Sequence, residues 1–259
     1  AGDTVVALTA SREAAKAVAG LDAVQYVEEA PEATLRNSTS RTIVQSGAVG
    51  PTPFYDNGIT GLGQVVGLID SRMDLNHCSF KDTVAPGAGH LTVLAFNASS
   101  GSAASHGTHT AGTLAGDNGD LTDTRGVAYG AKMVFNLTPS DVSTGTTFLS
   151  RLNQHHSQGA RVHSNSWGAD NRTDYNGWAW AIDRFSRDNE DSLVAFAVTN
   201  QSNLYTPENA KSCLGVGASQ DNSSINNHCS GGQGPTADGR RGTARRRRRT
   251  SRSGTSCGR

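Results

Sequence analysis

Four polar side chains in this sequence have the types needed for nucleophilic catalysis. Asp70 ends the apolar run 64–70, His106 opens the string His-Gly-Thr-His, Asn200 ends the apolar run 192–200, and Ser256 follows a Gly-Thr pair. A serine hydroxyl is a weak nucleophile until a neighbouring base removes its proton, and His106 could be that base for Ser256. An acid such as Asp70 on the other ring nitrogen would fix the histidine tautomer. The alternative for Asp70 is a cap on the following segment.

Three short apolar runs predict strands of a parallel sheet. They cover residues 64–70, 161–168 and 192–200. Unbroken apolar runs of this length fit strands that are buried on both faces. Open α/β sheets bind their ligands beyond the carboxyl ends of the strands. We therefore expect the polar groups that follow these runs to meet at one edge of the sheet.

Apolar spacing also predicts two helices. The first covers residues 147–158, with three inward-facing side chains: Phe148, Leu149 and Leu152. On this helix His155 and His156 are expected at the surface. The second helix is core-facing and has apolar side chains at i, i+4 and i+7: Trp178, Ile182 and Phe185. His163 lies inside a predicted strand and is expected to be a hydrogen-bonded core histidine.

The ordered motifs resemble those of the subtilisin family of serine proteases, in which the order is also Asp, His, Ser. Two longer phrases are similar to those of the alkaline-protease subgroup, whose members carry an extra β-rich domain after the catalytic one. These phrases are Gly-Ala-Arg-Val-His-Ser-Asn-Ser-Trp-Gly at 159–168 and Gly-Pro-Thr-Ala-Asp-Gly-Arg at 234–240. The resemblance covers roughly residues 40–240.

The resemblance implies a three-layer α/β domain with a mostly parallel sheet, and hydrolysis of peptide bonds through an acyl-enzyme on Ser256. Asp70 and His106 would complete the catalytic triad, and Asn200 would donate to the oxyanion. Substrate would pair in an extended form with three residues: Ser166, Trp167 and Gly168. The implied enzyme is a secreted monomer that needs no cofactor for its chemistry. Polypeptides are the expected partners, and binding to a membrane or to a nucleic acid is not expected.

The sequence departs from the family pattern near each of these groups. Arg72 stands where the family has glycine, and its guanidinium is expected to compete with His106 for Asp70. Thr199 replaces the glycine that precedes the oxyanion-hole asparagine. Ser256 is followed by Cys-Gly-Arg in place of a small apolar run.

Basic residues are concentrated at the carboxyl end. Residues 240–259 hold nine arginines and no acid, which leaves 14 basic against 23 acidic residues in 1–239, a net charge of −9. The consecutive arginines at 245–249 are typical of a disordered block. A polyanion contact is one interpretation of this block, and the interpretation we favour is a reading-frame error. We therefore keep an alternative function, an inactive remnant or pseudoprotease with a polyanion-binding tail, and expect the 259-residue polypeptide itself to be inert.

The sequence predicts three parts of the chain. Residues 1–37 are expected to be a partial, α+β propeptide-like segment, 38–239 an incomplete catalytic domain, and 240–259 an anomalous tail that carries the Gly-Thr-Ser motif. In the first part we expect strands over 4–8 and 23–29, and a helix over 11–18 that Ser11 caps. Both ends of the chain are expected to be clipped, with any secretory signal lying upstream.

Calcium and disulfide sites are suggested only weakly by the sequence. The resemblance implies structural calcium held by loop oxygens, and the candidate loop is Asp117-Asn118-Gly119-Asp120 with Asp123. An ordinary solvated acidic turn is the alternative. The four cysteines are Cys78, Cys213, Cys229 and Cys257. Because Cys257 adjoins the candidate nucleophile, a single disulfide is expected among the other three.

Overall fold

The computed structural model describes residues 11–22, 24, 37–98, 101–117, 119, 125–199, 203–217 and 236–237. The chain divides into two compact units, Ala1–Leu35 and Arg36–Arg259. In the first unit, helix α1 (Arg12–Ala19) follows Ser11, whose hydroxyl accepts a hydrogen bond from the Ala14 amide at 3.2 Å. The predicted helix and its cap are confirmed. Apart from Val24, the strands expected in this segment lie outside the described residues, and its propeptide role stays a prediction.

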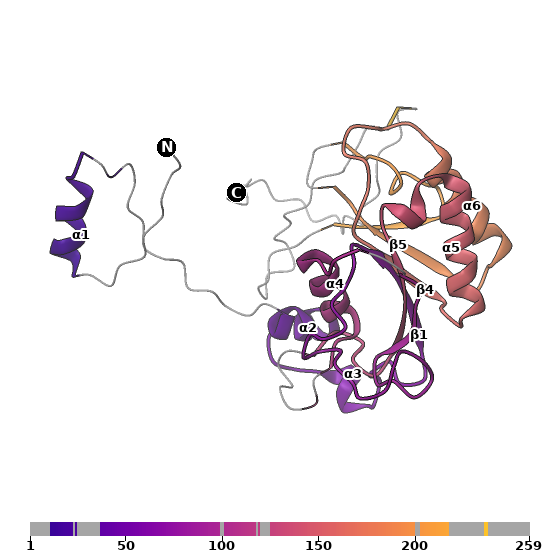
Figure 1. The fold of residues 1–259 in the computed structure, drawn as a ribbon, viewed down its shortest axis with the longest axis horizontal. Helices are drawn as coiled ribbons and strands as arrows, with labels where there is room; N and C mark the ends of the chain where they lie inside the picture. The colour runs from indigo at the N-terminus through magenta and orange to yellow at the C-terminus, as the bar shows by residue number, and fades with distance from the viewer. Residues whose placement is uncertain are drawn as a thin grey trace. The chain divides into compact units, whose positions relative to one another are not determined.

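The second unit is built on a six-stranded parallel sheet in the order β2-β3-β1-β4-β5-β6 (Figure 1). The strands are β1 (Val65–Asp70), β2 (Val93–Phe96), β3 (Lys132–Leu137), β4 (Val162–Asn165), β5 (Leu193–Ala197) and β6 (Cys213–Val216). Strand β1 pairs with β3 on one side and with β4 on the other, so the strand order reverses beside it. Such a switch point opens a crevice beyond the carboxyl ends of the strands, which is where Asp70 lies.

Helices cover both faces of this sheet and make the three-layer α/β fold that was predicted. The helices described in this unit are α2 (Asn37–Ser46), α3 (Pro53–Asp56), α4 (Ser105–Ala115), α5 (Gly145–Ser157) and α6 (Gly177–Asp188), with a 3₁₀ turn at Ser140–Val142, and α4, α5 and α6 pack on the sheet. Ala111 of α4 packs in one core cluster with Leu68 of β1. Ile69, the next residue of β1, packs in the other cluster with Phe148 of α5 and Ile182 of α6. Consecutive strand residues point to opposite faces, so β1 joins both layers.

Several sequence predictions are corrected by these elements. The run 161–168 is a strand only over Val162–Asn165, so Ser166, Trp167 and Gly168 lie just beyond its carboxyl end. His155 is fully buried, so its expected surface position is wrong. Strands β2, β3 and β6 were not predicted. Within the described part of the chain, no helix has the length and apolar character needed to span a lipid bilayer.

Candidate active site

Asp70 is the last residue of β1 and is only 1% exposed. Its Oδ1 accepts hydrogen bonds from the Ser71 amide at 2.7 Å and from His106 Nδ1 at 2.6 Å. Its Oδ2 lies 3.1 Å from the hydroxyl oxygen of Thr110. A buried carboxylate is expensive unless it is hydrogen-bonded and paired, and these donors meet that need. The acid is therefore fixed in position and directed at the histidine.

Gly107 explains how His106 comes within reach of Asp70. A Cβ atom at this position would lie 1.7 Å from the Ser71 carbonyl oxygen, so only glycine fits. The Gly107 amide also donates to the Ser71 hydroxyl at 2.9 Å. The first turn of α4 therefore packs directly against the residue that follows β1. The glycine of the His-Gly-Thr-His string is a requirement of this close approach.

His106 presents most of its ring to solvent while one edge is held by the acid. Its side chain is 58% exposed, against 2% for the side chain of Asp70. Because Nδ1 donates to the carboxylate, Nε2 carries the free lone pair, and it has no hydrogen-bond partner among the described residues. An imidazole in this state can remove a proton from a hydroxyl group. The predicted meeting of Asp70 and His106 is confirmed.

Ser71 and Thr110 were not recognised in the sequence as partners of the acid. The Ser71 hydroxyl lies 3.2 Å from Asp70 Oδ1, in addition to the amide contact. Thr110 Oγ1 is also 3.2 Å from the Gly107 carbonyl oxygen, so its single proton serves one acceptor at a time. A signal was present, because Thr110 follows His106 at i+4 and so lies on the same helix face.

Arg72 does not take the position expected from its sequence. Its Nη1 donates to the Ala98 carbonyl oxygen at 3.2 Å, and its guanidinium lies 4.9 Å from the centre of the Phe96 ring. Those contacts hold the side chain over strand β2. The proposed competition with His106 for Asp70 is therefore wrong.

The segment that was expected to bind substrate is anchored through Trp167. The indole Nε1 donates to Asn165 Oδ1 at 3.3 Å, and the ring packs edge-on against Phe148 and Phe196 at 5.1 Å each. The next residue, Gly168, is exposed. The tryptophan is thus an anchor in the core, and the neighbouring backbone is the part that remains accessible.

Asn200 and Ser256 lie outside the described residues. The described residue nearest to the expected oxyanion-hole asparagine is Thr199, whose amide donates to Glu208 Oε1 at 3.4 Å. It follows β5, and all strands are parallel, so Thr199 lies at the same edge of the sheet as Asp70. The assignments of Asn200 and Ser256 stay predictions.

Comparison with known proteins settles the family. The model of the subtilase family matches residues 61–257. The chain belongs to this family. The match includes the segment of Ser256, whereas the alkaline-protease subgroup stays a prediction.

Relatives of this subtilase chain are much longer proteins. The serine protease/ABC transporter B family protein tagA of Dictyostelium discoideum is 29% identical in an alignment 227 residues long, which covers 78% of this chain and 13% of that protein. For tagB of the same organism the identity is 26% in an alignment 224 residues long, which covers 75% of this chain and 12% of that protein. The chain therefore spans about an eighth of the curated relatives it matches.

Solved structures show the same fold. The prenylagaramide maturation protease PagA has a TM-score of 0.50 and 21% identity, over 66% of this chain and 59% of that chain. The protease domain of PatA has a TM-score of 0.50 and 22% identity, over 66% of this chain and 62% of that chain. At these identities the likeness establishes the architecture alone.

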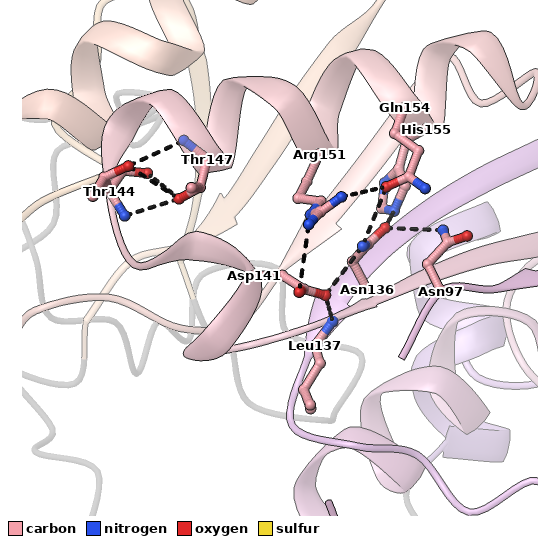
Figure 2. Close-up of polar contacts among 9 residues, drawn as sticks. All are labelled: Asn97, Asn136, Leu137, Asp141, Thr144, Thr147, Arg151, Gln154 and His155. Carbon is pink, nitrogen blue, oxygen red and sulfur yellow. Dashed lines mark hydrogen bonds and ion pairs between the residues drawn. The ribbon is translucent and has the colours of Figure 1, made fainter. Parts of the chain in front are cut away.

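A polar network around Asn136 supports the sheet of this subtilase domain (Figure 2). Asn136 of β3 is 1% exposed, and its Oδ1 accepts from His155 Nε2 at 2.8 Å and from Asn97 Nδ2 at 3.0 Å. Asn136 Nδ2 donates to Asp141 Oδ2 at 3.1 Å. The same Asp141 oxygen accepts the amide of Leu137, the residue that pairs with Asp70. The network thus holds the end of β3 next to the end of β1 that carries Asp70.

Two buried histidines pack over Gly67 of β1. Burial, together with the nearby His163 and Arg151, lowers the pKa of His155 to about 3. Burial, together with the nearby His156 and Arg161, lowers the pKa of His163 to about 4. A Cβ atom at Gly67 would lie 2.5 Å from His155 Nδ1 and 2.8 Å from His163 Nδ1, so glycine makes room for both rings. His163 is a core histidine as predicted. However, neither of its ring nitrogens has a hydrogen-bond partner among the described residues.

The candidate calcium loop is described only in part. Asp117 Oδ1 accepts from Arg125 Nε at 2.9 Å and from the Gly119 amide at 2.9 Å, so this oxygen already serves a cation of the chain. No group of three or more His, Cys, Asp or Glu side chains in the described residues could hold a metal ion. The remaining members of the loop lie outside the described residues, and calcium binding stays a prediction.

The cysteines differ from expectation. Cys78 is an exposed free thiol, and Cys213 is a half-buried one whose pKa burial raises to about 12. Any single disulfide among Cys78, Cys213 and Cys229 needs at least one of these two residues. The expected disulfide is therefore wrong.

Proposed function

We propose that this chain is the catalytic domain of a serine endopeptidase that cuts peptide bonds through an acyl-enzyme on Ser256. The proposal is carried by one observation, the 2.6 Å contact between His106 Nδ1 and Oδ1 of the buried Asp70. A histidine whose Nδ1 is bound by an acid and whose Nε2 is free can take the proton of a serine hydroxyl and so activate it. Membership of the subtilase family, through a match that reaches residue 257, supports the choice of Ser256.

In the proposed mechanism, His106 Nε2 takes the proton from the Ser256 hydroxyl as its oxygen attacks the substrate carbonyl carbon. The negative charge that develops on the carbonyl oxygen is stabilised by the Asn200 side-chain amide and the Ser256 backbone N–H. His106 then gives its proton to the leaving amine, and water releases the acyl group by the same route. Asp70 stays ionised throughout and stabilises the imidazolium.

The proposed substrate is an extended polypeptide. Its backbone would lie along Ser166, Trp167 and Gly168, because main-chain pairing is tolerant of side-chain sequence. The exposed Gly168 and the anchored ring of Trp167 support this role. Secretion, a monomeric state and structural calcium belong to the same proposal.

The test uses a fluorophosphonate probe and hydrolysis of casein. It is made on the protein with a family-like segment restored after Arg240, called the full-length wild type below, because the 259-residue polypeptide itself is expected to be inert. The wild type should be labelled on Ser256 and should hydrolyse casein, whereas Ser256→Ala should lose both properties. Ser253→Ala, three residues earlier in the same motif, is the matched control and should keep both. A folded wild type without labelling at Ser256 would instead support the inactive remnant, whose arginine-rich segment should then bind heparin.

A further inference from the structure

Glu208 is a buried carboxylate close to the proposed oxyanion hole. It is 6% exposed. Its Oε1 accepts hydrogen bonds from the Thr199 amide at 3.4 Å and the Tyr205 amide at 3.2 Å. These two residues flank the segment 200–204, so Glu208 connects the two ends of the segment that contains Asn200.

The other oxygen of Glu208 lies against the proposed substrate-binding strand. A Cβ atom at Gly168 would lie 3.4 Å from Glu208 Oε2 and 3.1 Å from the Thr206 carbonyl oxygen. The amide of Ala169 donates to that same Thr206 oxygen at 2.9 Å, in an isolated antiparallel bridge. The two segments are thus held together, with Oε2 next to the exposed backbone of Gly168.

Among the described residues, no cation pairs with this carboxylate. Every ion pair between described residues involves other acids. Burial raises the pKa of Glu208; hydrogen bonds from backbone amides, those of Tyr205 and Thr199 among them, offset part of this effect, and the nearby negative charge of Asp170 adds to it. Buried carboxylates in proteins are usually paired, because an isolated charge in a low-dielectric site is costly. Glu208 therefore has an unmet need for a positive partner, beside a surface where substrate is proposed to lie.

We infer that Glu208 selects a lysine or arginine side chain at the substrate residue whose carbonyl is attacked. The inference rests on the proposed function. That residue must reach from the strand at Gly168 to the oxyanion hole after Thr199, and Glu208 touches both segments. Backbone pairing is indifferent to sequence, so a side-chain preference requires a group such as this carboxylate. The cationic side chain supplies the charge partner that Glu208 lacks.

A purely structural role for Glu208 makes a different prediction. If the carboxylate only accepts the Thr199 and Tyr205 amides, its loss disturbs the oxyanion hole and slows all substrates by the same factor. A specificity role changes the ratio between substrates. The ratio of kcat/KM for two peptides that differ at one residue therefore separates the two roles.

The experiment measures kcat/KM of the full-length protein on fluorogenic peptides that differ only at this residue, which is Lys, Arg, Leu or Phe. The wild type should prefer Lys and Arg over Leu by at least about tenfold, and Glu208→Gln should lower that ratio by at least about tenfold. Glu190→Gln removes an exposed acid after α6 and should leave the ratio unchanged. For a readout without a variant, a peptide aldehyde ending in arginine should inhibit the wild type at least about tenfold more tightly than one ending in leucine.

Other outcomes overturn the inference. A wild type that cleaves Leu or Phe peptides as well as Lys peptides would refute it while leaving the peptidase proposal intact. So would a Glu208→Gln protein with an unchanged ratio, or with an equal loss on every peptide. A folded wild type that cleaves no peptide and takes no fluorophosphonate would remove the proposed function and this inference together.

Discussion

Gly107→Ala is expected to remove most of the peptidase activity, because this glycine sets how closely α4 approaches the end of β1. The added Cβ atom would lie 1.7 Å from the Ser71 carbonyl oxygen and 2.6 Å from its carbonyl carbon. Real Cβ contacts are essentially never shorter than 3.0 Å, so the two backbones must separate by about 1.3 Å. Both groups are main chain, and no change of rotamer can relieve the clash.

The size of the loss follows from that displacement. His106 precedes Gly107, and a shift of about 1 Å in a catalytic group costs roughly 10²-fold in rate. We therefore expect kcat to fall by roughly 10²-fold. Overpacking of this kind costs about 1–3 kcal/mol of stability, of which the better helix propensity of alanine returns about 0.5–1 kcal/mol.

The matched control is Gly112→Ala in the same helix, where the added Cβ atom would meet only Phe80 Cζ at 3.9 Å. That variant should keep its kcat and gain up to about 1 kcal/mol of stability. The assay is steady-state hydrolysis of one peptide, with thermal unfolding measured on the same samples. If Gly107→Ala kept kcat within about threefold of wild type, α4 could withdraw without disturbing the pair, and the reasoning would be refuted.

Three further predictions concern the surroundings of the pair. Thr110→Val should lower kcat by about tenfold and Thr110→Ser should restore it, because hydrogen bonds to charged groups such as Asp70 are worth about 1.5–3 kcal/mol. A Thr110→Val enzyme with unchanged kcat would show that the hydroxyl donates to the Gly107 carbonyl oxygen instead. His155 and His163 are neutral when folded, with pKa about 3 and about 4, and bind protons when unfolded, so the free energy of unfolding should fall as the pH drops from about 6.5 towards 4. Each contributes about 1.4 kcal/mol per pH unit, and urea titrations should show that His163→Leu halves this slope; an equal slope in both proteins would contradict the assignment. Arg72→Gly should not raise kcat/KM, since the guanidinium lies over β2; a clear rise would mean that it reaches Asp70 in solution.

Apolar runs were enough to predict strands β1, β4 and β5, but they could not reveal β2, β3 and β6. Strand β3 begins with Lys132 and contains Asn136, which looks like a surface residue in sequence. The structure buries Asn136 because Asn97, Asp141 and His155 satisfy its amide from distant parts of the chain. Strand β6 has only four residues, and one of them is a glycine. Partners that are far apart in sequence leave no local signal.

The placement of His155 could have been predicted. Phe148, Leu152 and His155 recur at i, i+4 and i+7, and all three are buried. His155 was expected at the surface because it is polar, although its spacing from Phe148 and Leu152 indicates a buried position. A buried histidine is tolerated here because Asn136 accepts its Nε2 proton. In this helix, spacing was a better guide than residue type.

For the candidate site, the sequence predicted the contact between Asp70 and His106 and missed the residues that support it. Asp70 and His106 were recognisable because each closes or opens a distinctive segment. Glu208 in a loop has no such signature, and Thr110 has only its i+4 spacing from His106. Their roles depend on segments that are far apart in the sequence and meet only in the fold. Thr110 depends on the contact of α4 with β1, and Glu208 depends on the contact of residues 206–208 with the Gly168 backbone.

The acid–base pair is complete before any nucleophile is considered. Asp70 accepts from the Ser71 amide and hydroxyl, from the Thr110 hydroxyl and from His106, and each of these donors lies within the described residues. None of these contacts requires Ser256. The orientation of the histidine is therefore built into the junction of β1 and α4, and an enzyme that lacks the serine should keep it. Because Asp70 and His106 are already oriented, they need no rearrangement during the reaction. The pair can therefore activate a hydroxyl group that the carboxyl-terminal segment places at His106 Nε2.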